Sequence, residues 1–164
     1  AGIVIIIIFM TVLYGRLGII ASIALVLYTL FVLSIFKVST LTPYGITLTL
    51  SGIAGFILSI GMAVDANILI FERMKEERRL GRSWHESLEL GFARAWTSIR
   101  DSNISSLITS FVLYQYGTGS VRGFALTLAI GVVVSMFSAI IVTRTLLNVM
   151  LNSFQHLVPK KMGS

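Results

Sequence analysis

Apolar residues occur along the chain in five long runs and do not alternate with polar residues. The runs cover about 1–13, 17–36, 46–71, 98–116 and 124–147. A helix rises 1.5 Å per residue, so it needs about 20 apolar residues to cross the roughly 30 Å hydrocarbon layer of a membrane. The last four runs are about that long, and we expect the first to be the end of a span that begins upstream of Ala1. The pattern predicts an all-α membrane protein, a polytopic transmembrane helix bundle of five hydrophobic helices over residues 1–147.

A polar connection, residues 72–97, separates the third run from the fourth and holds all five glutamates. Arg73 and Glu77 have the spacing of an i,i+4 ion pair on a helix that continues from the third run. Ser83 and Glu86 have the spacing of a capping box, which starts a new helix. Four large apolar residues then recur at every fourth position: Trp84, Leu88, Phe92 and Trp96. This predicts an amphipathic connecting helix in the headgroup layer, or alternatively a solvated helix packed on the bundle.

The remaining connections are short, and the charges are distributed unevenly among them. Turns are predicted at 14–16, 37–45 and 117–123, and a polar tail at 148–164. If five runs cross the membrane, eleven of the 13 lysines and arginines lie on the side of the 72–97 connection and the tail, and only Lys37 and Arg122 on the other. Cytoplasmic loops carry such an excess, so we expect the connection and the tail to be cytoplasmic. The same bias accounts for the net charge of +6 without a nucleic-acid partner.

Composition excludes several classes of protein. The chain is 55% hydrophobic and only 12% charged, whereas soluble domains carry about 25% charged residues. It contains no cysteine, which rules out disulfides and thiolate metal sites. Neither His85 nor His156 has metal-ligand spacing with another candidate ligand. We therefore expect no metal and no cofactor. No Ser-His-Asp, Walker or zinc-site pattern indicates an enzyme either.

Small residues recur at every fourth position in three of the runs. The third run carries Ser51, Gly55, Ser59 and Ala63, the fourth carries Ser102, Ser106 and Ser110, and the fifth carries Gly123, Thr127, Gly131, Ser135, Ala139 and Thr143. Small side chains let helix backbones approach each other closely. We therefore expect these three runs to form the packed interior, with helix packing at Gly55, Gly61, Gly131 and Ser135. The second run, rich in Leu, Ile and Val, is expected at the periphery.

Asp65 is the main candidate for chemistry, because it lies inside the third run. It precedes Glu72 by seven residues, or roughly 10 Å along a helix. An aspartate at the centre of a span costs about 2.5–3.5 kcal/mol to insert, so a functional role is the default interpretation. We predict that its carboxyl group carries protons, with Asn67, Asp101 and Asn103 as candidate neighbours. The alternative is a structural hydrogen bond to a serine or asparagine on a neighbouring helix.

Two charged residues near the ends of runs have simpler interpretations. Asp101 follows Arg100 at the predicted start of the fourth run, where the helix dipole stabilises an acid without any further function. Arg144 lies near the predicted cytoplasmic end of the fifth run. We expect its side chain to extend to the lipid headgroups.

The segment around Asp65 resembles a known family. Residues 61–72, GMAVDANILIFE, followed by Arg73 and the Glu76-Glu77 pair, are similar to the signature of the SecD branch of the SecD/SecF protein-export membrane proteins. SecF has a different segment around its aspartate. Later stretches also agree: Gly91-Phe92, Arg94-Ala95, Asp101 with Asn103, Gly117-Thr118-Gly119, Gly123-Phe124-Ala125 and Thr143-Arg144. The resemblance covers nearly the whole chain, and the family belongs to the resistance-nodulation-division superfamily.

The resemblance implies a role in protein export. SecD-type proteins act with SecF, as a separate or fused chain, and with the SecYEG translocon. They use the proton-motive force to help move a preprotein across the bacterial or archaeal cytoplasmic (inner) membrane, and the residue matching Asp65 takes part in proton transport. The family unit has six spans with a large extracytoplasmic domain after the first. The five runs here would therefore be spans two to six of that unit.

Two other functions remain open at this point. The chain could belong to another proton-coupled transporter of the superfamily, exporting lipids or drugs. It could instead be an intramembrane aspartyl protease in which Asp65 and Asp101 share a proton. Ala63-Val64 precedes the aspartate, however, where such proteases carry Gly-x-Gly, so we expect a transporter and not an enzyme.

Overall fold

The structure, a computed structural model, describes residues 2–39 and 49–155, and almost all of them are helical. The helices are α1 (Gly2–Tyr14), α2 (Arg16–Ser39), α3 (Leu50–Arg79), α4 (Trp84–Tyr116) and α5 (Gly119–Phe137), followed by the π-helix η1 (Ser138–Thr143) and α6 (Arg144–Gln155). No strand occurs in these ranges. The all-α bundle predicted from the apolar runs is confirmed. The predicted turn at 37–45 lies largely outside the described residues, as do His156, Lys160 and Lys161.

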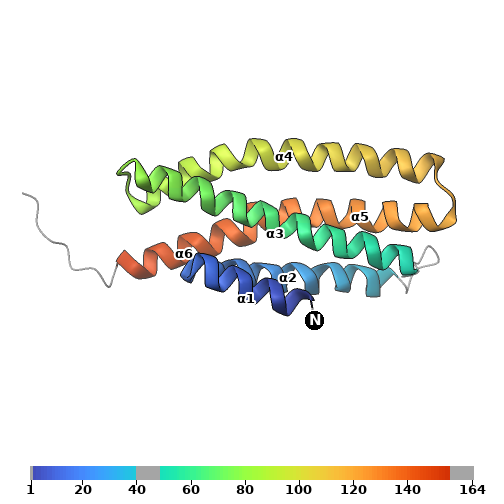
Figure 1. The fold of residues 1–164 in the computed structure, drawn as a ribbon, viewed down its shortest axis with the longest axis horizontal. Coiled ribbons are helices and arrows are strands. Elements are labelled where there is room, and N and C mark those ends of the chain that lie inside the picture. The colour runs from blue at the N-terminus through green and yellow to red at the C-terminus, as the bar shows by residue number, and fades with distance from the viewer. Residues whose placement is uncertain (1, 40–48, 156–164) are drawn as a thin grey trace, which may run out of the picture.

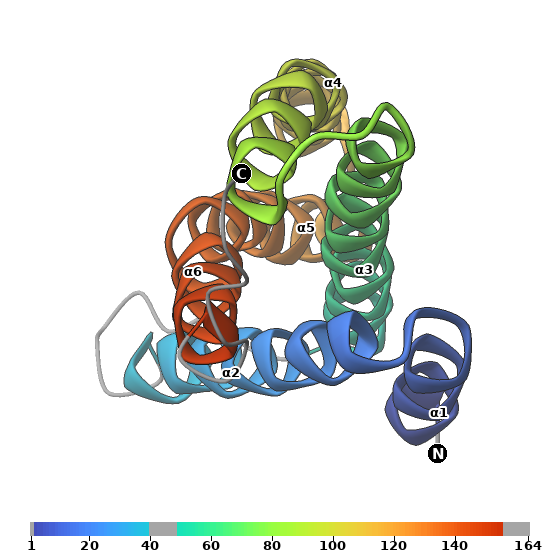
Figure 2. The same cartoon turned by 90° about the vertical axis from the view of Figure 1, so that its left-hand side faces the viewer.

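The helices lie side by side along one long axis (Figure 1). Viewed along that axis, α3 and the continuous α5–η1–α6 unit stand next to each other, with α4 on one side and α2 on the other (Figure 2). α1 packs on the outside of α2. The α1–α2 turn, the α3–α4 turn and the end of α6 lie at the same end of the bundle. Most of the described lysines and arginines therefore gather at one end.

Local signals in the sequence place the turns at that end. Gly15 joins α1 to α2 with φ +54°, and Gly81 lies between α3 and α4 with φ +85°, a backbone conformation that favours glycine. The predicted capping box is confirmed: the Ser83 hydroxyl accepts from the Glu86 amide at 3.2 Å, and the Glu86 carboxylate accepts from the Ser83 amide at 3.0 Å. α4 thus begins at Trp84.

Three predicted boundaries differ from the structure. The connecting helix and the fourth run form one 33-residue helix, α4. Leu88, Phe92 and Ala95 are buried and hold the first part of this helix in line with the rest of the bundle. No separate helix lies in a headgroup plane among residues 84–116. The predicted turn at 117–123 shortens to two residues, because α5 begins at Gly119. The first residues of the predicted tail are helical, because Leu147 and Leu151, on successive turns of α6, are buried.

Close helix contacts occur where small residues face each other across α3 and α5. A β-carbon on Gly55 would lie 2.5 Å from Thr127 Oγ1 and 2.6 Å from the Phe124 carbonyl oxygen, and one on Gly131 would overlap the Ser59 side chain. Ser135 is buried and donates to the Val132 carbonyl at 2.8 Å. Because glycine has no β-carbon, the backbones of α3 and α5 can approach each other closely at these positions.

α2 is less peripheral than predicted. It buries Tyr28, Val32 and Phe36 almost completely. The Tyr28 hydroxyl lies 2.8 Å from Ser59 Oγ and 3.2 Å from the Gly131 carbonyl oxygen. One phenol thus joins α2 to both α3 and α5, and the aliphatic side chains on the other face of α2 remain exposed.

Three stretches of helix are long and apolar enough to cross a membrane: Arg16–Ser39, Leu50–Arg79 and Gly119–Ser153. α1 is a shorter apolar helix. α4 falls below this level of hydropathy because its middle carries Arg100, Asp101 and Asn103. The polar middle of α4 therefore needs neighbours other than lipid.

Candidate proton-transfer site

Asp65 lies on the face of α3 that borders α4, where a pocket of about 190 Å³ opens between the two helices. The pocket is lined by Met62, Asp65, Ala66, Leu69, Ile99, Ser102 and Asn103. It combines a carboxyl group, a hydroxyl group and an amide group with apolar walls, and it has room for several water molecules. Such a pocket can admit water to the Asp65 carboxyl group.

The structure brings one of the three candidate neighbours to Asp65. Asn103 is buried and lines the pocket. Asn67 is two residues from Asp65, hence about 200° around the helix, and accepts a hydrogen bond from Thr143. Asp101 is exposed and pairs with Arg100 at 2.9 Å. It lies in the middle of α4, so the helix-dipole explanation offered for it does not apply.

Asp65 is not in the packed interior of this chain. Its side chain is exposed, and the small-residue contacts lie elsewhere on α3. Nothing in the described chain lies within 4 Å of a β-carbon added to Gly61, one turn earlier, so Gly61 makes no close helix contact here. The face that carries Gly61 and Asp65 is open to another molecule.

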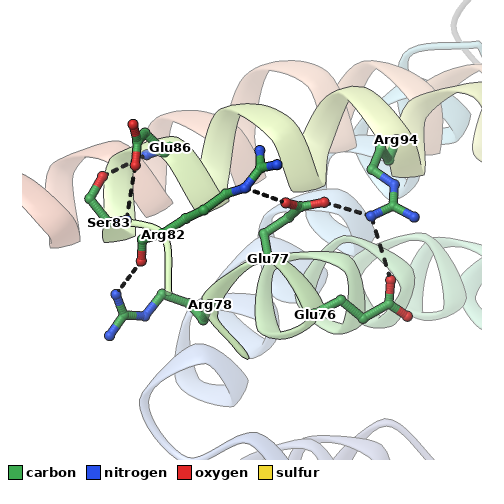
Figure 3. Close-up of polar contacts among 7 residues, drawn as sticks. All are labelled: Glu76, Glu77, Arg78, Arg82, Ser83, Glu86 and Arg94. Carbon is green, nitrogen blue, oxygen red and sulfur yellow. Dashed lines mark hydrogen bonds and ion pairs between the residues drawn. The ribbon is translucent and has the colours of Figure 1, made fainter. Parts of the chain in front are cut away.

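A second polar cluster holds the turn between α3 and α4 (Figure 3). Glu77 is 2% exposed, and Arg94 donates to its Oε1 at 2.5 Å. Arg82 Nε lies 3.1 Å from Oε2, in a geometry that leaves this oxygen without a hydrogen bond. The predicted Arg73–Glu77 pair is wrong: Arg73 pairs with Glu76 at 2.8 Å, because Glu77 points toward α4.

The charges of this cluster shift the pKa values of groups around it. The hydrogen bond to Glu77 raises the pKa of the Arg94 guanidinium. At the start of α4, the Ser83 backbone amide donates to the Glu86 carboxylate and lowers the pKa of Glu86. Both groups are therefore firmly charged at neutral pH, and their role is to fix the turn.

Arg144 does not extend freely to lipid headgroups as predicted. Its guanidinium lies 2.7 Å from the Glu89 carboxylate and 5.1 Å from the centre of the Phe92 ring. These contacts tie the start of α6 to α4, because the unbroken α4 brings Glu89 alongside.

Sequence reasoning missed Ser102 as a pocket residue and Glu77 as a buried acid. Ser102 was assigned to a packing ladder, although it is adjacent to Asn103 and could have been placed with it. Glu77 has the spacing of an i,i+4 pair with Arg73, and no local signal marks it as buried. Among residues 2–39 and 49–155, no group of three or more His, Cys, Asp or Glu side chains could hold a metal ion.

Comparison with known proteins identifies the family. Residues 1–153 match the family of the protein export membrane protein SecD/SecF, C-terminal. The chain is 53% identical over 152 residues to the protein translocase subunit SecD of Synechocystis, covering 93% of this chain and 31% of that protein. It is 49% identical over 162 residues to the SecD subunit of Rickettsia prowazekii, covering 99% and 30%. The chain thus spans less than a third of the length of these relatives.

Solved structures agree with these matches. The crystal structure of SecDF, a translocon-associated membrane protein from Thermus thermophilus, superposes with a TM-score of 0.86 at 42% identity, covering 93% of this chain and 21% of that one. SecDF in a super-membrane-facing form gives a TM-score of 0.81 at 43% identity, covering 93% and 20%. Sequence and architecture together show that this chain belongs to the SecD/SecF C-terminal family of protein-export membrane proteins.

Proposed function

We propose that this chain is the transmembrane part of a SecD-type factor that couples proton flow to Sec-dependent translocation of preproteins. Asp65 takes up a proton from one side of the membrane and releases it to the other. The observation that carries the proposal is the position of this carboxyl group, inside an apolar span yet beside a pocket with Ser102 and Asn103. An ionisable group in such a place is functional by default.

The exposed face around Asp65 supports a partner subunit. Leaving a charged carboxylate against acyl chains costs about 2.5–3.5 kcal/mol, so a second polar surface must cover it in the assembly. Gly61 leaves space for close approach on the same face. A SecF-type protein, separate or fused, is the partner we propose, because similar solved structures are of SecDF.

The remaining partners follow from the same family role. The similar Thermus protein is described as translocon-associated, so we propose the SecYEG translocon as a partner and a preprotein as the substrate. The bundle end with the α3–α4 turn faces the cytoplasm, because it carries most of the described basic residues and positive charge is retained on that side of a bacterial or archaeal inner membrane.

The test compares the two aspartates of the chain in the full-length subunit, assembled with its partners in proteoliposomes. Asp65→Asn removes the proton carrier, and Asp101→Asn is the matched control because it makes the same change at an exposed residue outside the pocket. A potential of 100 mV supplies about 2.3 kcal/mol per charge, or up to about 40-fold in rate. We expect Asp65→Asn to abolish the potential-dependent part of export and Asp101→Asn to retain it. Undiminished potential-dependent export in Asp65→Asn would refute the proton role.

A further inference from the structure

A hydrogen bond on the far side of α3 bears on where Asp65 points. The Thr143 hydroxyl donates to Asn67 Oδ1 at 2.9 Å. Thr143 is fully buried and Asn67 is 5% exposed. The bond joins the middle of α3 to the last residue of the π-helix η1, 76 positions away in the chain. It is therefore a tertiary contact between two buried side chains. Removing one partner would leave the other polar group buried without a hydrogen bond, which lowers stability.

Thr143 differs from other threonines of the bundle in what it binds. The hydroxyl groups of Thr29, Thr109 and Thr127 donate to carbonyl groups of their own helices, four residues earlier. Thr127 is the closest comparison, because it is also fully buried and lies on the same ladder. The Thr143 hydroxyl donates instead to a side chain of α3, so its bond is interhelical.

The π-helix is what keeps Thr143 facing α3. A position repeated every fourth residue drifts by about 40° per step around a straight α-helix. A π-helical turn, with i→i+5 bonds, holds more residues and offsets part of this drift. Ala139 and Thr143, both within η1, consequently remain buried. Single π turns of this kind recur at functional sites.

Asn67 and Asp65 lie on opposite faces of α3, about 200° apart. The bond from Thr143 therefore acts with the close contacts of Gly55 and Gly131 to fix the rotation of α3 from the side opposite Asp65, and this rotation decides whether the Asp65 carboxyl group faces the pocket. On the Asp65 face, α3 borders α4 across the pocket, and a β-carbon added to Gly61 would meet nothing within 4 Å in the described chain, so the packing on this side leaves room for α3 to turn.

We propose that Asn67 and Thr143 are a positioning pair that sets the direction of the Asp65 carboxyl group through the rotation of α3. The consequence of this pair for proton transfer rests on the proposed function of Asp65. The effect of the pair on the rotation of α3 does not depend on that function. Loss of the bond leaves the Asn67 amide buried without its partner and releases α3 to turn.

Cysteine labelling tests the geometry independently of transport. The chain has no cysteine, so Asp65→Cys introduces a single thiol here, in a full-length assembled subunit cleared of other cysteines. The probe is a water-soluble maleimide. Thr143→Val removes the donor and preserves shape, Asn67→Leu removes the acceptor, and Thr143→Ser retains the donor. Thr29→Val is the matched control, because the Thr29 hydroxyl donates to the Leu25 carbonyl of its own helix, α2.

We expect Thr143→Val and Asn67→Leu each to change the labelling rate at position 65 by about fivefold or more, equivalent to about 1 kcal/mol. The double variant adds little to either single change, and Thr143→Ser and Thr29→Val stay within about 1.5-fold. Equal labelling rates in Thr143→Val and Thr29→Val overturn the proposal. If Thr143→Val does not assemble, Asn67→Leu decides alone by the same criterion.

The pH profile of proton flux, with Asp65 intact, links the pair to transport. No other titratable residue lines the pocket, and the nearest charges on α4, Arg100 and Asp101, pair with each other. We expect Thr143→Val to displace the pH of half-maximal flux and Thr29→Val to leave it in place. If Thr143→Val changes the labelling rate but not the pH profile, the link between the pair and transport is refuted. The proton role of Asp65 is tested separately, and undiminished flux in Asp65→Asn refutes it.

Discussion

Gly131 is the position where the packing of the bundle can be tested most directly. A β-carbon at this position would overlap Ser59 Oγ and Cβ and would lie 3.1 Å from the Tyr28 hydroxyl oxygen. Ser59 cannot simply turn aside, because its hydroxyl accepts from Tyr28 and donates to the Phe56 carbonyl at 2.7 Å. Gly131→Ala must therefore separate α5 from α3 or break these hydrogen bonds.

The cost can be worked out from these contacts. Overpacking a close-packed interior costs about 1–3 kcal/mol, and each buried hydrogen bond lost adds about 1 kcal/mol. Alanine is a better helix former than glycine by about 1 kcal/mol, which offsets part of this. With one hydrogen bond lost, the last two effects cancel, and we expect Gly131→Ala to lower the free energy of unfolding by about 1–3 kcal/mol.

Steric trapping in bicelles, which measures unfolding within a lipid environment, is the assay. Gly61→Ala is the matched control, because its β-carbon meets nothing within 4 Å, and it should be neutral or stabilising. Ser59→Gly removes the overlapping atoms, so Ser59→Gly with Gly131→Ala should lose less stability than the sum of the two single variants. If Gly131→Ala and Gly61→Ala differ by less than about 0.5 kcal/mol, the close contact of α3 with α5 is not what stabilises the bundle.

Two further predictions concern the turn between α3 and α4. Glu77→Ala leaves Arg94 and Arg82 without their buried acid and should destabilise the turn by about 2 kcal/mol. The measurement is amide hydrogen exchange around residue 81, which should become faster. Glu72→Ala, at an exposed residue, is the control and should leave this exchange rate unchanged. The pKa of Glu86 is lowered from its ordinary value of 4.5, so its contribution to stability is present above pH 4.5 and is lost as the pH falls through the lower, folded pKa. The Ser83 amide resonance should follow that titration and should be pH-independent in Glu86→Gln; a midpoint at or above 4.5 contradicts the capping geometry.

Much of the fold could be predicted because its signals are local. The apolar runs give the helices, and the spacing of Ser83 and Glu86 gives the start of α4 without knowledge of tertiary contacts. The break expected near residue 97 did not occur, because burial of Leu88 and Ala95 against α3 depends on how two helices meet. A pattern at every fourth residue cannot distinguish such a neighbour from a lipid surface.

In the candidate site, the sequence predicts the direction in which Asp65 points but not the hydrogen bond between Asn67 and Thr143. Asp65 lies two residues from both Ala63 and Asn67, so helix geometry alone places it opposite the small-residue ladder and excludes an interior position. The bond between Asn67 and Thr143 has no comparable signal. It depends on the π turn in residues 138–143, whose sequence, SAIIVT, contains neither proline nor glycine to mark it.

The unbroken length of α4 has a mechanical consequence. Its 33 residues extend about 50 Å, well beyond the roughly 30 Å hydrocarbon layer, and the salt bridges of Glu77 fasten it to α3 near the tip. Asp65 lies 16 residues before Gly81, about 24 Å along the axis. If this hairpin tilts as one rigid unit, a rotation of about 5° about residue 65 displaces its tip by about 2 Å.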